Sequence, residues 1–221
     1  MGDMSRVTDT KLSRDVATQV LPSVRSGILG MTLILSLTAL GLAQGPWRYI
    51  GPEDRTASVS DLAMVPADPM TLYAGTSGDG VFQSTDRGAS WSRINQGLPI
   101  RSNIRALAIN PTDPMTLYAG GLDGMFQSTD RGANWGVINN GLTTLNVRAL
   151  AMDPTDPMTL FAGTDGSGVF QTTDGGAHWS AVNNGLDKPN IRSLMIDPTD
   201  PMRVYAGTVS GVFQTTDEGR P

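Results

Sequence analysis

The sequence has 221 residues, with 26 Gly, 14 Pro, 17% charged residues and no Cys, and its formal net charge is −5 at pH 7. This length allows one sizeable domain, and the Gly and Pro content favours short strands joined by tight turns over a helical bundle. The lack of Cys excludes disulfides, zinc–thiolate sites and thiol nucleophiles, and the acidic balance argues against nucleic-acid binding, which needs a cationic surface.

Residues 1–43 form a distinct N-terminal segment. A polar stretch with four basic and three acidic side chains precedes the apolar run GILGMTLILSLTALGLA (27–43). Gly41 and Ala43 are small residues at the −3 and −1 positions of a cleavage site. We predict a signal peptide cleaved after Ala43, and hence a secreted or periplasmic protein; an uncleaved membrane anchor is the alternative. Residues 44–221 retain 12 of the 16 Lys and Arg and 18 of the 21 Asp and Glu, a formal net charge of −6.

Residues 44–221 contain an internal repeat. The segments VFQSTDRGASW (81–91), MFQSTDRGANW (125–135), VFQTTDGGAHW (169–179) and VFQTTDEGRP (212–221) place an Asp at spacings of 44, 44 and 43 residues. Self-similarity at this period indicates repeated supersecondary units.

Each repeat reads as four short strands. In the second copy these are NIRALAINP (103–111), MTLYAG (115–120), MFQS (125–128) and WGVI (135–138). Pro111 and Pro114 break the backbone ladder and predict a turn after the first strand. Four antiparallel strands in about 44 residues correspond to one propeller blade. We therefore predict an all-β fold, with three complete four-stranded blades over about 58–98, 103–142 and 146–186 and part of a fourth.

The Asp-containing segment is predicted to form the turn between the third and fourth strands. The Asp accepts hydrogen bonds from backbone amides one or two residues ahead, a Ser or Thr hydroxyl adds a bond, and Gly supplies a positive φ. The Trp fills the gap between neighbouring sheets. The residues expected in these structural roles are Ser84, Asp86, Gly88, Trp91, Ser128, Asp130, Gly132, Trp135, Thr172, Asp174, Gly176, Trp179, Thr215, Asp217 and Gly219.

The pattern Ser/Thr-x-Asp-x-Gly-x-x-Trp resembles the Asp-box, also called the bacterial neuraminidase repeat (BNR). Three copies match in full and the fourth lacks its Trp, and with the flanking strands the resemblance covers about residues 47–221. It implies an Asp-box β-propeller of the sialidase, sortilin and xyloglucanase superfamily, in which the box is a turn element away from the active site. It implies no single function, because sialidases, xyloglucan-hydrolysing enzymes, sortilin-type receptors and photosystem II assembly factors all carry the box.

The N-terminal WRYIGP (47–52) aligns with the fourth-strand segments WSRINQGLP (91–99) and WGVINNGL (135–142). Two interpretations explain this orphan strand. Either the two ends of a four-bladed ring share a blade, with Trp47 replacing the missing Trp, or residues 44–221 are the N-terminal part of a larger propeller. We favour the larger propeller.

Three aspartates are candidate ligand-binding residues. The loops between second and third strands share one face with the loops between blades, and function usually resides on such loops. Asp79, Asp123 and Asp165 recur in these loops and form a candidate cation-binding or sugar-binding ring. Asp beside Gly is also an ordinary turn choice.

Three arginines are further candidates. Arg105, Arg148 and Arg192 recur at the start of the first strand, where the first blade has Ser60. They invite comparison with the arginine triad that binds the sialic acid carboxylate in sialidases. Because these arginines are repeat-equivalent, a structural pairing with a carboxylate or a carbonyl is the favoured interpretation.

No catalytic residue, metal site or cofactor is predicted. Arg93 and Ile94 are followed by Asn95 instead of the Pro of the sialidase Arg-Ile-Pro stretch, no long insertion supplies a Tyr nucleophile, and the sole His, His178, occupies a turn position. We predict an exported, non-catalytic module that binds or assembles with an extracellular or periplasmic protein or carbohydrate. Contact with a membrane is expected only through an uncleaved N-terminal segment. The alternative is a sialidase-like or xyloglucanase-like glycoside hydrolase whose catalytic residues lie in further blades.

Overall fold

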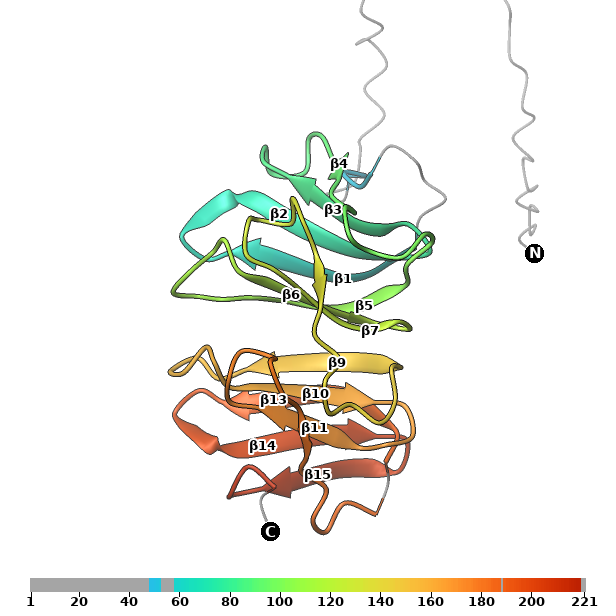
Figure 1. Cartoon of the computed structure of the whole chain (residues 1–221). Helices are drawn as coiled ribbons and strands as arrows, with labels where there is room; N and C mark the ends of the chain where they lie inside the picture. Colours follow the sequence, from blue (N-terminus) through green and yellow to red (C-terminus); the bar gives the residue numbers. More distant parts are fainter. Residues whose placement is uncertain (1–47, 53–57, 188, 220–221) are drawn as a thin grey trace, which may run out of the picture. The chain divides into compact units, whose positions relative to one another are not determined.

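The computed structural model describes residues 48–52, 58–187 and 189–219 (Figure 1). The chain divides into two compact units, Met1–Pro46 and Trp47–Pro221. The predicted signal segment (1–43) and Trp47 lie outside the described residues. Within the described ranges, no helix has the length and apolar character needed to cross a membrane.

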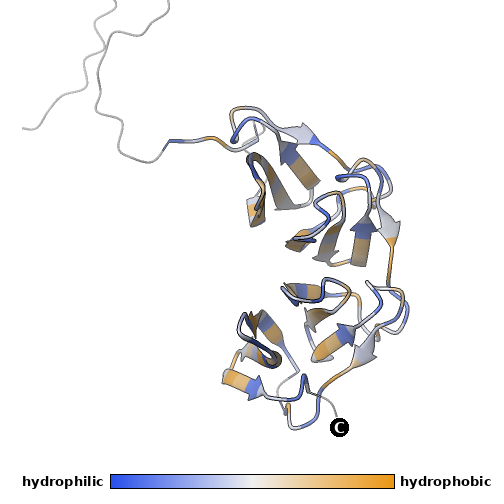
Figure 2. Ribbon diagram, turned by 90° about the vertical axis from the view of Figure 1, so that its left-hand side faces the viewer, coloured by the Kyte–Doolittle hydropathy of each residue, from blue (hydrophilic) through white to orange (hydrophobic). Residues whose placement is uncertain are grey.

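The described part of the second unit is all-β, with four antiparallel sheets and no helix (Figures 1 and 2). The first sheet contains β1 (Ser58–Val65), β2 (Asp68–Ser77), β3 (Gly80–Ser84) and β4 (Ser92–Arg93). The second contains β5 (Ile104–Ile109), β6 (Leu117–Gly121), β7 (Gly124–Ser128) and β8 (Gly136–Val137). The third contains β9 (Val147–Met152), β10 (Leu160–Thr164), β11 (Val169–Thr172) and β12 (Ser180–Ala181). The fourth contains β13 (Ile191–Asp197), β14 (Asp200–Thr208) and β15 (Gly211–Thr215).

These sheets confirm the predicted arrangement of short antiparallel strands in each repeat. In every sheet the strands lie side by side in sequence order. The innermost strands contact one another in series, β1 with β5, β5 with β9 and β9 with β13.

The core lies between consecutive sheets, because each second strand sends alternate side chains to opposite faces. In β6, Leu117 and Ala119 pack in the cluster shared with the first sheet, whereas Tyr118 packs in the cluster shared with the third. In β10, Leu160 faces the second sheet and Phe161 faces the fourth. One repeat therefore cannot bury its apolar side chains without neighbours on both sides.

A glycine in each second strand allows the sheets to approach closely. A Cβ atom built at Gly75 would lie 2.8 Å from Ile104 Cγ2 of the next sheet, and one at Gly120 would lie 2.7 Å from Val147 Cγ1. Gly163 meets Ile191 in the same way, at 2.4 Å. The recurring Gly of this strand is therefore a packing requirement of the junction between sheets.

The four sheets form an open series. Ile104, Val147 and Ile191, the first inward residues of β5, β9 and β13, are all 0% exposed, whereas their equivalent Val59 in β1 is 42% exposed. Val212 in β15 is 75% exposed. The hypothesis of a closed four-bladed ring required these side chains to be covered, so it is wrong for the described residues. The hypothesis of a larger propeller stays a prediction.

Candidate functional site

One end of each sheet is formed by a turn between the third and fourth strands, named here the Asp turn (residues 84–91, 128–135, 172–179 and 215–219). In the second Asp turn, Ser128 Oγ donates to Asp130 Oδ1 at 2.7 Å and accepts a bond from the Gly132 amide at 2.8 Å. Asp130 Oδ1 also accepts the Asn134 amide at 2.8 Å. The first and third turns repeat this pattern.

This geometry corrects one detail of the sequence interpretation. In the three complete turns, the Asp accepts the amide four residues ahead, and the Ser or Thr hydroxyl, not the Asp, accepts the glycine amide. Only Asp217, in the fourth turn, accepts the amide two residues ahead, from Gly219 at 3.0 Å. The expected positive φ is present at each turn glycine, and the residue before it also has a positive φ, such as 61° at Arg131.

The turn aspartates are held ionised by their hydrogen bonds. The side-chain and backbone bonds from Ser90, followed by the Ser84 hydroxyl, lower the pKa of Asp86 to about 2. The Asn134 side chain lowers the pKa of Asp130 in the same way. These carboxylates accept their hydrogen bonds from residues of their own turn, which agrees with the structural role expected of them.

Each turn Trp connects its sheet to the preceding fourth-strand segment. Trp135 Nε1 donates to the carbonyl of Ile94 at 2.7 Å, and Trp179 Nε1 donates to the carbonyl of Ile138 at 2.9 Å. Trp135 is 5% exposed and Trp179 is 1% exposed. Both side chains fill the gap between neighbouring sheets, as predicted from the sequence.

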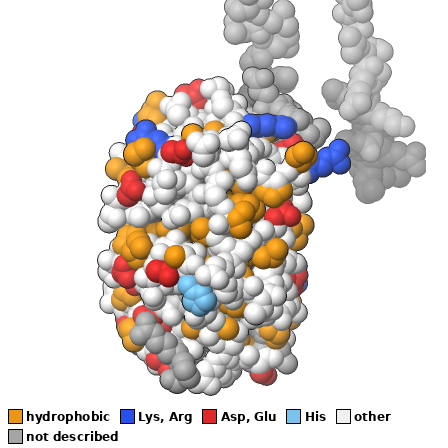
Figure 3. Space-filling view, in the orientation of Figure 1, with side chains coloured by type: hydrophobic (Ala, Val, Ile, Leu, Met, Phe, Trp, Pro, Cys, Tyr) orange, Lys and Arg blue, Asp and Glu red, His pale blue; other side chains and the backbone are white. Residues whose placement is uncertain are grey.

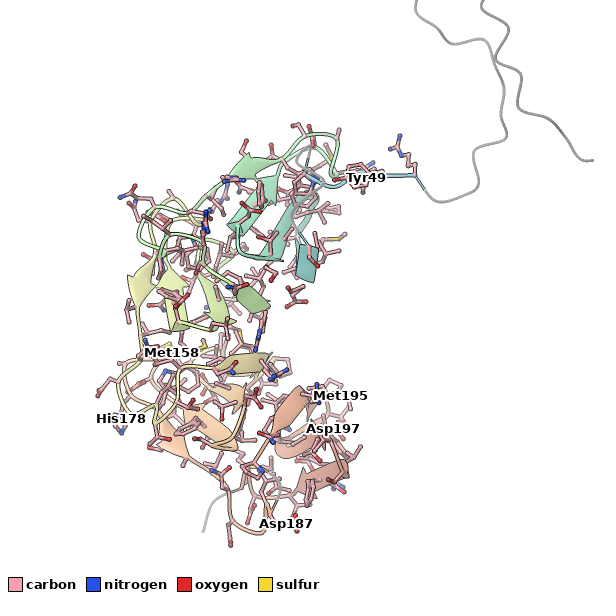
Figure 4. The ribbon with its side chains drawn as sticks, turned by 90° about the vertical axis from the view of Figure 1, so that its right-hand side faces the viewer. Tyr49, Met158, His178, Asp187, Met195 and Asp197 are labelled. Carbon is pink, nitrogen blue, oxygen red and sulfur yellow. The ribbon has the colours of Figure 1, made fainter. Side chains whose placement is uncertain are left out.

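His178 lies at an exposed position of the third Asp turn. Its amide donates to Asp174 at 3.0 Å, and its side chain is exposed, as Figures 3 and 4 show. Among the described residues no group of three His, Cys, Asp or Glu side chains is placed to hold a metal ion.

In the second, third and fourth sheets, the opposite end carries one of the candidate arginines, and each lies at a β-bulge. The register of β5 with β6 runs from Ile104 directly to Ala106, and thus skips Arg105. The same break occurs between Gly163 and Thr164, opposite Arg148, and between Ile191 and Ser193, around Arg192. A bulge leaves one residue unpaired and re-aims its side chain.

The bulges place Arg148 and Arg105 in one hydrogen-bonded group with Asn146 and Asp165. Arg148 Nη2 forms an ion pair with Asp165 Oδ2, and Asn146 Nδ2 donates to the same oxygen at 3.2 Å. Arg105 Nη1 donates to Asn146 Oδ1 at 2.6 Å. The pKa of Asp165 is lowered, chiefly by the hydrogen bond from Arg148 and further by the charges of Arg148, Arg105 and Arg192. We call these five residues the bulge arginine cluster.

The cluster has an excess of positive charge, with three guanidinium groups against one carboxylate. Arg192 is exposed, and Arg105 and Arg148 are half-buried. Arg148 Nε is buried and has no hydrogen-bond partner among the described residues. Guanidinium groups bind carboxylates and other planar anions through paired N–H donors, so this arrangement can hold an anionic group.

The three aspartates of the candidate ring do not lie at equivalent positions, and a cation-binding or sugar-binding role for them stays a prediction. An Asn two residues after the fourth strand donates to a carbonyl of this loop in each of the first three sheets. The pairs are Asn95 with Asp79, Asn139 with Asp123 and Asn183 with Ser167. Asp165 instead corresponds to Ser77, since each forms a backbone bridge with the Asn that precedes the next inner strand, Ser77 with Asn103 and Asp165 with Asn190. The sequence already shows this shift, because SGDG (77–80) and DGSG (165–168) have the same length and place Asp165 at the position of Ser77.

The other two aspartates have separate surroundings. Asp79 pairs with Arg93 at 2.8 Å, and the guanidinium carbon of Arg93 lies 5.3 Å from the centre of the Phe82 ring. The carboxylate of Asp123 makes no hydrogen bond with another described residue. Sequence reasoning also missed Asn146, although Asn before Ile-Arg or Val-Arg recurs at 103, 146 and 190 and would have marked it.

Comparison with known proteins supports the fold. No family model matches the sequence, and no curated protein matches it. Among solved structures, an ancestral GH74 enzyme aligns with a TM-score of 0.59 and 22% identity over 73% of this chain and 23% of its own. The GH74 enzyme of Niastella koreensis aligns with a TM-score of 0.58 and 20% identity over 73% and 29%. YCF48 bound to D1 peptide aligns with a TM-score of 0.53 and 16% identity over 70% and 49%.

These neighbours are β-propeller proteins, so the four sheets of this chain have the architecture of propeller blades. The chain spans about a quarter of the two GH74 enzymes and about half of YCF48. At these identities the likeness concerns the fold alone.

Proposed function

We propose that residues 44–221 form a non-catalytic binding or assembly module, and that the bulge arginine cluster is its ligand-binding surface. The ligand is a protein or carbohydrate that presents a carboxylate or another anionic group. We further propose export, as the signal-like segment at residues 1–43 predicts.

One observation carries this proposal: three sheets have an arginine at the same bulge position, Arg148 pairs with Asp165, and Arg105 joins this pair through Asn146. A bulge does not require arginine, since the first sheet has Ser60 there. The cluster also concentrates positive charge on a unit whose formal net charge is −6. Such local complementarity attracts anionic groups and orients them.

Calorimetric titration with matched ligands tests the proposal. A panel of peptides with a terminal carboxylate and of acidic glycans is compared with amidated peptides and neutral glycans of the same length. We expect binding of anionic members only, with affinity falling as salt is raised.

Arg192→Ala is the decisive variant, because Arg192 is exposed and its loss leaves the Arg148–Asp165 ion pair intact. We expect it to weaken binding without a change in melting temperature. Arg203→Ala is the matched control, since Arg203 pairs with Asp200 at the Pro-rich turn. Equal binding by all three proteins, or no binding by any panel member, would refute the proposal.

A second candidate function is glycoside hydrolysis, which the fold likeness to two GH74 enzymes favours. Such hydrolysis uses two carboxyl groups flanking the scissile bond, one of them with a raised pKa. Every described carboxyl group with a resolved shift has a lowered pKa instead, namely Asp86, Asp130, Asp165, Asp174 and Asp197. In this candidate the catalytic residues lie in further blades, as the sequence interpretation expected. Release of sugar from xyloglucan or from a fluorogenic sialoside by the full chain would establish it and overturn the non-catalytic proposal.

A further inference from the structure

The first strand of every sheet has one edge outside the sheet ladder, named here the inner edge. In the described part of the chain, β1, β5, β9 and β13 are each hydrogen-bonded only to the second strand of their own sheet. The four strands also contact one another in series. A backbone amide that points to the inner edge therefore needs an acceptor from a side chain, from water or from a ligand.

Asp61 in β1 supplies such acceptors to two amides. Its Oδ1 accepts the amide of Leu62 at 2.9 Å, and its Oδ2 accepts the amide of Leu107, in the next inner strand, at 2.7 Å. One carboxylate thus bridges the inner edges of two neighbouring sheets. Hydrogen bonds from backbone N–H groups to a carboxylate are shorter and stronger than those between neutral groups.

The register of the sheets places two further amides in the same position. In each sheet a leucine of the inner strand lies opposite an alanine of the second strand: Leu62 opposite Ala74, Leu107 opposite Ala119, Leu150 opposite Ala162 and Leu194 opposite Ala206. In β10, the amide of Thr164 donates to the carbonyl of Gly168 on the β11 side, at 2.9 Å. Because successive strand residues alternate sides, Ala162 also faces β11, and the amide of Leu150 points to the inner edge. The same register gives Leu194 the same direction.

No side chain can do for Leu150 and Leu194 what Asp61 does for Leu107. Asp61 pairs with the second-strand glycine of its sheet, and the residue with this pairing in the third sheet is Ala149. Alanine has no hydrogen-bond acceptor in its side chain. Leu150 and Leu194 are half-buried. Both strands that border this place, β9 and β13, belong to the described chain, so the place does not depend on either end of the series of sheets.

Positive charge lies on the same two strands. Arg148 precedes Leu150 by two residues in β9, and Arg192 precedes Leu194 by two residues in β13. Two residues of a strand span about 6.6 Å, so both guanidinium groups are near the two amides. Arg148 Nε is buried and has no hydrogen-bond partner among the described residues. A negatively charged ligand group is therefore favoured at these amides over a neutral acceptor.

We infer that the amides of Leu150 and Leu194 bind a carboxylate group of a ligand, as the amides of Leu62 and Leu107 bind the carboxylate of Asp61. The inference rests on the proposed function and deepens it, since it names the ligand group and the backbone atoms that hold it. The first sheet carries this carboxylate as a side chain, whereas the third and fourth sheets take it from the ligand.

NMR with acetate as the probe tests the site, and acetamide is the matched neutral control. Labelling the full 221-residue chain with [15N]leucine reports all four equivalent amides in one spectrum. Acetate is expected to move the amide proton signals of Leu150 and Leu194 downfield along a saturable curve. Leu62 and Leu107 should not respond, because Asp61 already accepts their amides. Acetamide should move none of the four signals.

Ala149→Asp places a carboxylate where Asp61 has one. The signals of Leu150 and Leu194 should then lie downfield without acetate. The apparent Kd for acetate should rise by about tenfold or more, which corresponds to one charge-assisted hydrogen bond. Ile100→Asp is the matched control, because it adds the same charge at a loop residue that is 97% exposed, and it should leave the response unchanged.

Asp61→Ala is the reciprocal variant and does not require a new side chain to fit. It removes the acceptor of the Leu107 amide, which should then respond to acetate. This gain of response decides the question if Ala149→Asp does not fold.

Three results would overturn the inference. One is the absence of a saturable shift at Leu150 and Leu194, and another is an equal shift with acetamide. The third is a response of Leu107 in the unmodified chain as large as that of Leu150. Failure of the proposed function has a different signature: the anionic panel does not bind in calorimetry, although acetate moves the two amides. Binding of the panel without these shifts sinks the inference alone.

Discussion

The two ends of each sheet repeat to different degrees. At the Asp-turn end, the hydroxyl, the carboxylate and the positive-φ glycine recur in all four copies with nearly the same hydrogen bonds. At the bulge end, the loops between the second and third strands differ in sequence and length: SGDG (77–80), LDG (122–124), DGSG (165–168) and VSG (209–211). The third loop begins with Asp165, where the first has Ser77. In the Asp turn, side chains accept hydrogen bonds from backbone amides of the same turn. Replacing these side chains would therefore lower the stability of the fold. The bulge residues have no ladder partner, and their side chains are the ones that we propose to bind ligands.

The largest expected effect is at the turn end. Trp179→Ala removes a side chain that is 1% exposed and joins two sheets, so we expect a loss of ~3–5 kcal/mol in the free energy of unfolding. Urea denaturation measures it. Trp91→Ala is the matched control at the first sheet, where the Trp is only half-buried, and its loss should be smaller. Equal losses would show that junction burial does not set the stability of the turn end.

Ser128→Ala should have the next largest effect. It leaves the Gly132 amide without its hydroxyl acceptor in a buried turn, at a cost of ~1–3 kcal/mol. Ser90→Ala removes an exposed hydroxyl from Asp86 in another copy and should stay within ~0.5 kcal/mol of the parent. Thermal unfolding of the two variants measures the difference, and a reversed order would contradict the assigned roles.

Acid should weaken the turn end selectively. The folded pKa of Asp86 lies at about 2, below its model-peptide value of 3.8, and the pKa values of Asp130 and Asp174 are also lowered. A carboxyl group with a lowered folded pKa contributes stability above its unfolded pKa and loses it as the pH falls through the folded value. We therefore expect the melting temperature to fall between pH 3.8 and about 2. The Asp86→Asn variant should show a flatter fall, and a slope identical to that of the parent would exclude Asp86 as a contributor.

The smallest effect on stability is expected at the bulge end. Asp165→Asn removes a partly exposed ion pair, worth about 0–1 kcal/mol, and leaves three guanidinium groups without their carboxylate. We expect nearly unchanged unfolding but stronger binding of anionic ligands, measured by titration. Weaker anion binding would mean that Asp165 positions Arg148 for the ligand instead of competing with it.

The sequence by itself predicted the repeat, the four strands of each unit and the turn chemistry, because these depend on local patterns of alternation, Gly, Pro and Asp. It named Arg105, Arg148 and Arg192 as candidates and favoured a structural pairing with a carboxylate or a carbonyl; Arg148 makes such a pair with Asp165. It missed the bulges, since register depends on the partner strand and not on the strand alone. Asp165 was grouped with Asp79 although its counterpart in the aligned repeat is Ser77.

Only the tertiary structure decided which surfaces meet. Local pattern marks Ile104 and Val59 as equivalent apolar residues, yet one is fully buried and the other is 42% exposed. Burial depends on a neighbouring sheet that the residue's own sequence does not contain. The same reason explains why the charges of three arginines from three sheets act on one carboxylate: the stacking of the inner strands, not their sequence, brings the bulges together.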